Sequence, residues 1–209
     1  NIVIGREAGR LLTSGHSNVL IGDEAGTNIT TARENVVIGK GAYANANTSE
    51  NFAVVVGYNA ANNVDGIDNV TAIGHSALST MVAVDGNVAV GFEAGKVTTG
   101  ANNTYLGFKA GKGASGAEGG NTGVGSRALE SVTTGGSNVV VGNQAGDTIT
   151  DGGENVIVGD GAGQTTTSVA QAVIVGRGAA QNGNITTGAN GTVAVGYKAL
   201  EALTSGQAN

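Results

Sequence analysis

Short runs of branched aliphatic residues recur along the chain, and each run ends just before a glycine. One residue before that glycine stands Ile, Val or Leu in every copy, and three residues before it stands Ile, Val or Thr. β-Branched residues favour extended backbone, and residues two apart in a strand lie on the same face of it. The pattern therefore predicts a strand over the three positions before each glycine, with one buried face formed by its first and third residues.

Aligning the chain on this glycine gives twelve copies of a unit N-x-x-[IVL]-G-x-x-A, in which the asparagine is present in eight. Most successive glycines are 17 residues apart, and the remaining steps are 16, 18 or 20 residues. A fixed period of this length is typical of solenoids, in which each repeat packs on its neighbours. The repeat glycines are Gly5, Gly22, Gly39, Gly57, Gly74, Gly91, Gly107, Gly125, Gly142, Gly159, Gly176 and Gly196. The predicted fold class is an all-β parallel β-solenoid, a β-roll or β-helix of twelve coils, with residues 1–209 forming a single repeat array.

The middle position of each predicted strand is apolar in most copies as well. Its side chain points to the face opposite the first and third residues. A strand that is apolar on both faces is normally covered on both. Because a coil of about 17 residues encloses only a thin interior, we expect this second face, formed by the middle residues, to contact another chain.

Two other positions of the unit predict structural features. Asparagine stands four residues before the glycine in eight copies, and amides stacked about 4.8 Å apart can form a ladder of hydrogen bonds. Alanine stands three residues after the glycine in all twelve copies, which predicts a tight inner corner. The remaining, more polar half of each unit is interpreted as a second short strand and a turn. Length changes within it, at 43–52, 112–121 and 181–191, are predicted to form surface loops.

Composition excludes several classes of protein. The 209 residues include 38 glycines but no cysteine, which excludes disulfides and thiolate metal sites. The net charge is −6 and the ten Lys and Arg are scattered, so nucleic acid is not an expected partner. No window reaches the roughly 18 apolar residues of a membrane span, so no membrane insertion of this segment is expected. The array begins on the first position of a unit and stops where another would begin, which suggests a segment of a longer fibre protein.

Few residues predict chemistry. The two histidines, His16 and His75, lie several coils apart without an acidic neighbour at ligand spacing, so no catalytic residue, metal site or cofactor is predicted. The acidic segments 65–69 and 147–155 could bind calcium through turn oxygens, but they lack the calcium-loop pattern, and solvated turns are the favoured interpretation. The stretch IGDEAG (21–26) fits the hexapeptide unit of β-helix acyltransferases, but those enzymes need several hexapeptides per coil. The chain is therefore predicted not to be an enzyme.

Aromatic residues gather at the position just after the repeat glycine. The four residues there are Tyr58, Phe92, Phe108 and Tyr197. If these rings point outward, they are glycan-binding candidates, because an aromatic stripe can stack on the sugar rings of a receptor polysaccharide. The alternative, which the sequence favours, is that they fill gaps between coils or at the axis of an oligomer.

The whole unit, N-x-[VAT]-[VAI]-G-x-x-A-[GL] followed by a turn of the T-T-G type, resembles the repeats of bacteriophage tail fibres and tailspikes and of the head domains of trimeric autotransporter adhesins. Residues 87–100 (NVAVGFEAGKVTTG) and 192–206 (TVAVGYKALEALTSG) carry the greatest similarity. The resemblance covers essentially the whole chain and implies a parallel homotrimer in which three β-rolls pack around one axis. Autotransporter heads usually repeat at a shorter period, which favours the viral group.

The function that this resemblance implies is that of a structural and adhesive shaft segment of a viral (phage) tail fibre. Such a segment is extracellular, on the virion, where it spaces receptor-binding surfaces from the particle and contributes to host attachment. Its partners would be its own copies in a homotrimer and a host cell-surface glycan or protein receptor. The alternative is the head repeat region of a bacterial trimeric surface adhesin, located on the bacterial outer surface.

Overall fold

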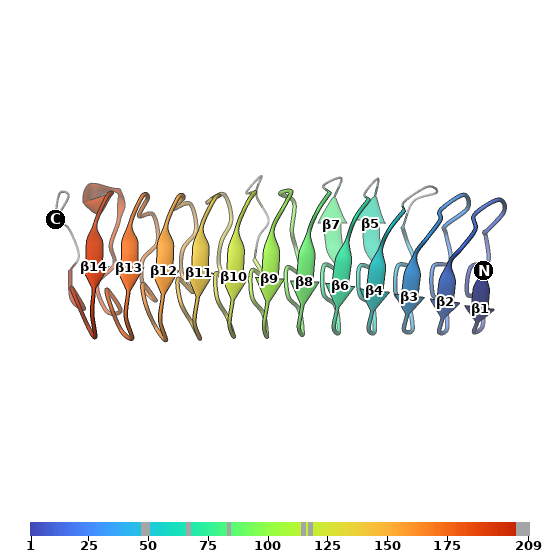
Figure 1. Cartoon of the computed structure of the whole chain (residues 1–209), viewed down its shortest axis with the longest axis horizontal. Coiled ribbons are helices and arrows are strands. Elements are labelled where there is room, and N and C mark those ends of the chain that lie inside the picture. Colours follow the sequence, from blue (N-terminus) through green and yellow to red (C-terminus); the bar gives the residue numbers. More distant parts are fainter. Residues whose placement is uncertain (47–50, 66–67, 83–84, 114–115, 117–118, 204–209) are drawn as a thin grey trace.

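The computed structural model describes residues 1–209 except 47–50, 66–67, 83–84, 114–115, 117–118 and 204–209. The chain winds into a rod of stacked coils, and the N-terminal and C-terminal coils lie at opposite ends (Figure 1). The strands are β1 (Ile2–Ile4), β2 (Val19–Ile21), β3 (Val36–Ile38), β4 (Val54–Val56), β5 (Asn63–Asp65), β6 (Thr71–Ile73), β7 (Thr80–Val82), β8 (Val88–Val90), β9 (Thr104–Leu106), β10 (Thr122–Val124), β11 (Val139–Val141), β12 (Val156–Val158), β13 (Val173–Val175) and β14 (Val193–Val195). The described residues contain no α-helix, and one 3-10 turn, η1 (Thr187–Ala189), precedes β14. The prediction of an all-β parallel β-solenoid is confirmed.

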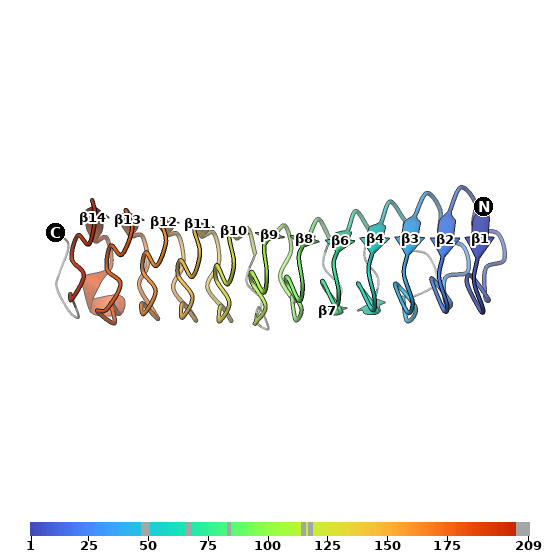
Figure 2. The same ribbon diagram turned by 90° about the horizontal axis from the view of Figure 1, so that it is seen from below.

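Twelve of the strands form one parallel sheet, in the order β1-β2-β3-β4-β6-β8-β9-β10-β11-β12-β13-β14. Neighbouring strands pair at equivalent positions of the repeat: Val139 pairs with Val156, which pairs with Val173. Each position of the strand is therefore stacked on its equivalents along the rod, which Figure 2 shows from below. As a consequence, a side chain at one position forms a ladder with the same position in the coils on either side.

The two faces of this sheet are the reverse of those predicted from the sequence. From β2 to β14 the middle residue of each strand in the sheet is buried, and Leu20, Val140 and Ile157 have no exposed surface. The first and third residues are exposed or half-exposed in every strand of the sheet. The prediction that the middle residues contact another chain is therefore wrong, as is the prediction that the first and third residues are buried. The reason is geometric, because a three-residue strand between two turns directs only its middle side chain into a narrow coil.

The interior of the rod is a single continuous core. The middle strand residues share it with the alanine that follows each repeat glycine by three positions, and Ala25 and Ala145 are fully buried, as the predicted inner corner requires. Residues of the second half of the coil, such as Ile149, complete it. Sizes are matched between coils: the large Tyr105 is followed in the next strand by Gly123, whose Cβ, if present, would lie 3.1 Å from Tyr105 Cδ1. At this step of the ladder, a small residue therefore makes room for a large one.

The second half of the coil forms strands in only two places among the described residues. There β5 and β7 pair as a short parallel sheet, with Asn63 opposite Thr80. In most other described coils this half forms a turn, because the main-chain N–H of its buried residue donates a hydrogen bond to a carbonyl oxygen of the same coil. Ile149 N, for example, donates to Gly146 O at 3.1 Å. The prediction of a second strand in every unit is therefore wrong for most coils.

A ladder of buried asparagines runs beside the sheet, as predicted. Asn138 Oδ1 accepts from the main-chain N of Asn155 at 3.1 Å and from Asn155 Nδ2 at 2.9 Å. Asn138 Nδ2 donates to Gly152 O at 2.9 Å. The ladder is interrupted where the unit carries Ala53 and Val70. Each buried amide therefore satisfies main-chain groups that no strand partner reaches.

We expect Asn138→Ala to lower the free energy of unfolding by about 1–3 kcal/mol, because the main-chain N–H of Asn155 would stay buried without its acceptor. Urea denaturation measures the loss. Asn143→Ala is the control, since Asn143 is exposed and its Nδ2 donates to Asp160 Oδ1 at the surface. The control should cost less than about 0.5 kcal/mol. Equal losses in the two variants would contradict a structural role for the buried ladder.

Candidate functional site

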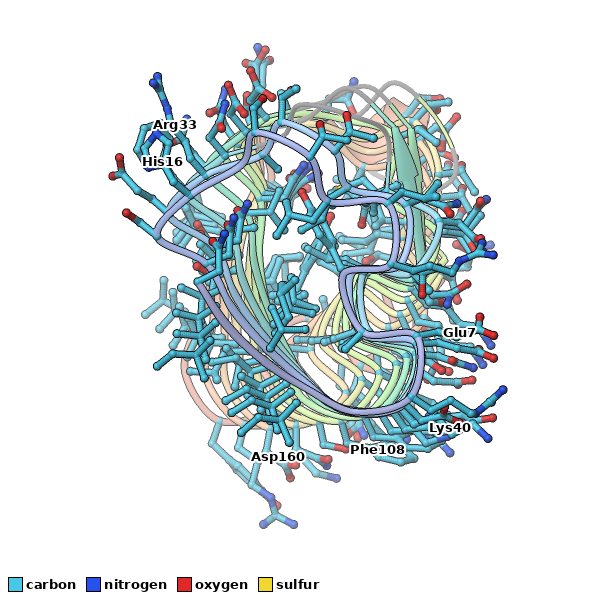
Figure 3. All side chains as sticks on the ribbon, turned by 90° about the vertical axis from the view of Figure 1, so that its right-hand side faces the viewer. Glu7, His16, Arg33, Lys40, Phe108 and Asp160 are labelled. Carbon is cyan, nitrogen blue, oxygen red and sulfur yellow. The ribbon has the colours of Figure 1, made fainter. Side chains whose placement is uncertain are left out.

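The outward positions of the sheet form one continuous apolar surface, which we call the apolar strip. It consists of the first and third residues of the twelve sheet strands, and all are aliphatic except Thr71, Thr104 and Thr122. Their exposed fractions reach 60% at Ile4 and 64% at Val195. Seen along the rod, side chains built only of carbon gather at the lower left of the coil (Figure 3). A monomer rarely exposes a contiguous apolar surface of this length without an interaction to make.

The apolar strip is bordered by two rows of mostly polar residues. The glycine-side margin is the residue after each repeat glycine, and the asparagine-side margin is the pair of residues five and six positions before it. The glycine-side margin holds Arg6, Asp23, Lys40, Tyr58, His75, Phe92, Phe108, Ser126, Asn143, Asp160, Arg177 and Tyr197. In Figure 3, Phe108 and Asp160 lie at the bottom of the coil, and His16 and Arg33 of the asparagine-side margin lie at its upper left.

The chain turns into the glycine-side margin because the repeat position is glycine. Its φ lies between +127° and +145° in all twelve copies, a region that glycine adopts readily and other residues do not. A Cβ added at Gly125 would lie 2.3 Å from Gly142 O in the next coil. The missing side chain therefore permits both the turn and the close approach of the coils. As a result, the residue after each glycine stacks on its equivalents.

Three of the predicted aromatic residues are brought together in this way. Tyr58, His75, Phe92 and Phe108 form a ladder with ring centroids 5.1, 5.1 and 5.4 Å apart and interplanar angles of 27°, 24° and 14°. His75 is a member of the ladder that was not predicted, because histidine was considered only as a ligand or a catalyst. Its position in the unit was the available signal. The fourth candidate, Tyr197, lies apart in the last coil, with Lys198 Nζ 5.8 Å from its ring centroid.

The stacking limits what the ladder can bind. A sugar ring recognised by an aromatic residue packs on the face of the aromatic ring, and both faces of His75 and Phe92 are covered by neighbouring rings. At one end of the ladder, Lys109 Nζ lies 5.0 Å from the Phe108 centroid. The geometry therefore supports packing between coils as the role of this ladder. Glycan binding by Tyr58, Phe92, Phe108 and Tyr197 stays a prediction.

Charged residues of the rod also form ladders. Arg6 Nε lies 2.9 Å from Asp23 Oδ1 and Lys40 Nζ lies 3.5 Å from Asp23 Oδ2, and the hydrogen bond from Arg6 lowers the pKa of Asp23. The hydrogen bond from Lys96, at 2.7 Å, lowers the pKa of Glu93 in the same way. Asp147 differs, because burial raises its pKa and the nearby Glu130 carboxylate adds to the effect.

Glu93→Gln and Asp147→Asn should change the thermal stability at pH 7 in opposite directions. Because the pKa of Glu93 is lowered in the fold, its ion pairs stabilise the protein at neutral pH, and this stabilisation is lost as the pH falls through the lowered pKa. Because the pKa of Asp147 is raised, its ionisation destabilises the fold at neutral pH. Calorimetry at pH 7 should show the melting temperature about 1–3 °C lower for Glu93→Gln and higher for Asp147→Asn. Both differences should vanish in acid, where the two carboxyl groups are protonated, and shifts of the same sign would contradict this account.

The structure also places the remaining sequence candidates. Within the described part of the chain, no group of three or more His, Cys, Asp or Glu side chains is arranged to hold a metal ion. Residues 66–67 of the acidic segment 65–69 lie outside the described residues, as do 47–50 of the loop 43–52 and 114–115 and 117–118 of the loop 112–121. The third loop, 181–191, contains η1, which lies on the upper edge of the rod in Figure 1.

A polar groove of about 550 Å³ crosses several coils and is lined by Lys112, Glu130 and Asp147, among others. Its charges are largely engaged within the chain: Lys112 Nζ lies 3.1 Å from Glu93 Oε2, and Arg127 Nε lies 3.5 Å from Glu130 Oε2. The groove is confined to neighbouring coils in the middle of the rod, whereas the apolar strip runs along all twelve sheet strands. We therefore regard the strip with its margins as the candidate functional site.

This chain matches no protein-family model, no curated protein and no solved structure. Among the residues that the structure describes, no helix has the length and apolar character needed to cross a membrane.

Proposed function

We propose that this chain is a structural and adhesive shaft segment of an extracellular fibre, which assembles with its own copies through the apolar strip. In this proposal the fibre is a viral (phage) tail fibre and the assembly is a homotrimer. The rod spaces the host-receptor-binding surfaces from the particle and contributes to contact with a host glycan or protein receptor. The observation that carries the proposal is the apolar strip itself, which continues through all twelve sheet strands.

The energetics support self-association. Covering the exposed part of one aliphatic side chain of the strip is worth roughly 0.5–1 kcal/mol. The strip positions of the twelve strands are aliphatic except for three threonines. Together the aliphatic positions supply on the order of 10–20 kcal/mol per chain, which exceeds the lower estimates of the cost of association. A flat ladder of uncharged β-branched residues that stayed in water would instead be an aggregation site.

The length and regularity of the rod support a spacing role. Twelve coils stacked at about 4.8 Å give a rod on the order of 58 Å long. Because each coil contacts only its neighbours, stability grows with the number of coils and the rod can be extended without a new core. A bacterial trimeric adhesin head uses the same kind of rod and is the alternative. The unit of about 17 residues, longer than is usual in those heads, favours the viral fibre.

Sedimentation equilibrium of the whole chain tests the proposal. We expect a mass of three times the 20.3 kDa of one chain, unchanged by high salt, because the proposed contact is apolar. A mass equal to one chain at micromolar concentration would overturn the proposal. A stable dimer would retain the self-association and overturn the trimer.

A further inference from the structure

The dipeptide Asn-Gly occurs twice in the chain, both times in the loop 181–191 that precedes β14. The two copies are Asn182-Gly183 and Asn190-Gly191, and both asparagines are exposed. In such a dipeptide the main-chain nitrogen of the glycine can attack the side-chain amide of the asparagine, because glycine has no side chain to hinder the approach. Since the two copies have the same local chemistry, the fold decides which of them can react.

The second dipeptide is held by the preceding coil. Asn190 Oδ1 accepts a hydrogen bond from the main-chain N of Ala170 at 2.9 Å. Gly191 N donates to Ala170 O at 3.0 Å. The nitrogen that would attack and the oxygen of the amide that would be attacked are therefore both engaged by one residue. Reaction at Asn190 requires both of these hydrogen bonds to break first.

The first dipeptide leaves the same two groups free. Gly183 is buried, and its main-chain N–H donates no hydrogen bond to any residue that the structure describes. Asn182 Oδ1 likewise accepts none from the described residues. Asn182 is engaged through its main-chain N, which donates to Glu201 O at 2.8 Å, and through Nδ2, which donates to Glu201 Oε1 at 3.1 Å. These contacts place the asparagine but leave the attacking nitrogen and the amide oxygen unblocked.

The free N–H of Gly183 results from the place of this glycine in the unit. Gly183 lies seven residues after the repeat glycine Gly176. At the equivalent position of an earlier coil, Ile149 N closes the turn by donating to Gly146 O at 3.1 Å. A Cβ added at Gly183 would overlap Leu203 O in the next coil, so this position requires glycine. Because buried N–H groups are normally paired, the unpaired N–H at this position is unusual.

We propose that Asn182 is a site of spontaneous deamidation and that the fold protects Asn190 from the same reaction. The main-chain nitrogen of Gly183 attacks Asn182 Cγ, so that an N–C bond forms and the Cγ–Nδ2 bond breaks. The displaced nitrogen leaves as ammonia with the proton from Gly183, and water then opens the cyclic imide to aspartate or isoaspartate. The reaction needs no co-reactant besides water. It is independent of the proposed assembly, because it concerns the loop 181–191 and not the apolar strip.

Deamidation would change the contact between Asn182 and the next coil. Nδ2, the atom lost as ammonia, is the donor to Glu201 Oε1. Lys198 Nζ, 3.0 Å from the same oxygen, would remain. The product sets a carboxylate oxygen against the Glu201 carboxylate in place of a donor, and isoaspartate also reroutes the main chain through the side-chain methylene. The last coil should therefore be held less firmly to the rod after the reaction.

Peptide mass spectrometry of the whole chain, incubated at mildly alkaline pH, tests the inference. Both asparagines lie in the peptide 178–198, between the cleavage sites after Arg177 and Lys198, so one fragmentation spectrum compares them. We expect Asn182 in the folded chain to convert about tenfold faster than Asn190, where hydrogen bonds must break before attack. In guanidinium chloride the two rates should become equal, because the dipeptides are the same.

Two results would overturn the proposed site. One is conversion of Asn190 in the folded chain at a rate equal to or above that of Asn182. The other is an unreactive Asn182 in the folded chain under conditions in which the denatured chain converts at both positions. Asn182→Gln gives the matched control for the assignment, since it keeps a side-chain amide but should remove the fast conversion from the peptide.

Hydrogen exchange tests the effect on the last coil. Asn182→Asp reproduces one product, and Asn190→Asp is the control, because an aspartate Oδ1 there can still accept from Ala170 N. The amide of Ala180, which donates to Ala199 O at 2.8 Å, reports the contact between the two coils. It should exchange about threefold faster in Asn182→Asp, as expected for like charges at an exposed site, and at the natural rate in the control. Equal exchange in the two variants would overturn the loosening of the last coil.

Discussion

Gly125→Ala is expected to abolish the cooperative folding of the rod at 25 °C. Gly125 has a φ of +134°, where an alanine is strained by about 1–3 kcal/mol. The new Cβ would also lie 2.3 Å from Gly142 O and 2.6 Å from Gly142 C. Those are backbone atoms of the next coil, so the clash cannot be relieved by rotating a side chain. The combined cost should exceed about 4 kcal/mol, which urea denaturation or loss of soluble protein would reveal.

Two glycines provide graded controls for this prediction. Gly196, the repeat glycine of the last described strand, has a φ of +127° but no atom within 4 Å of an added Cβ. Gly196→Ala should therefore show only the conformational part of the cost, about 1–3 kcal/mol. Gly188, an exposed residue of η1, also has no atom within 4 Å of an added Cβ, and Gly188→Ala should be neutral or slightly stabilising. A Gly125→Ala variant as stable as Gly188→Ala would contradict the stacking of the coils.

The sequence was sufficient for the period, for the strand before each repeat glycine and for the turn at that glycine, because each is decided by local chemistry. The strand in Val139–Val141 follows from β-branching, and the turn at Gly142 follows from a backbone conformation that favours glycine. The direction of the strand faces could not be obtained in the same way. Hydrophobicity points to Thr122 and Val124 as no less buried than Gly123, yet the coil encloses the glycine. Which face of the strand is enclosed depends on the curvature of the whole coil, and the sequence of a single unit does not specify that curvature.

The candidate site was only partly accessible from the sequence for a related reason. Aligning the units placed Tyr58, Phe92 and Phe108 in one column, and this was enough to identify them as a group. The angle between the rings depends on side-chain torsions and on the coil spacing, which the sequence does not express. Because the rings lie nearly parallel at about the spacing of the coils, their faces are covered by one another. The apolar strip lies on the outside because the middle strand residues fill the interior, and the sequence pattern alone does not decide between the two faces.

Changing opposite faces of one strand should separate folding from assembly. Val140 has no exposed surface, whereas Val139 and Val141 are 42% and 37% exposed. Val140→Asp would bury a carboxylate in an aliphatic core without a partner, at an expected cost of several kcal/mol, and should unfold the chain. The double variant Val139→Asp with Val141→Asp keeps the core intact, and the cost of aspartate at these two strand positions should be on the order of 1–2 kcal/mol. Sedimentation of this double variant should give a folded single chain of 20.3 kDa in place of an oligomer.

The residues stacked on Val139 and Val141 in the neighbouring coils are uncharged. Val139 stacks between Thr122 and Val156, so an aspartate there meets no other carboxylate along its ladder. Loss of the oligomer would therefore report contact between copies rather than repulsion within one coil stack. Circular dichroism distinguishes the two effects, since the double variant should keep the β signal that Val140→Asp loses. An oligomer that survives both aspartates would mean that copies meet elsewhere on the rod, and the strip would lose its role. If Val140→Asp folded and the double variant did not, the first and third strand residues would form the core, as the sequence pattern alone predicts.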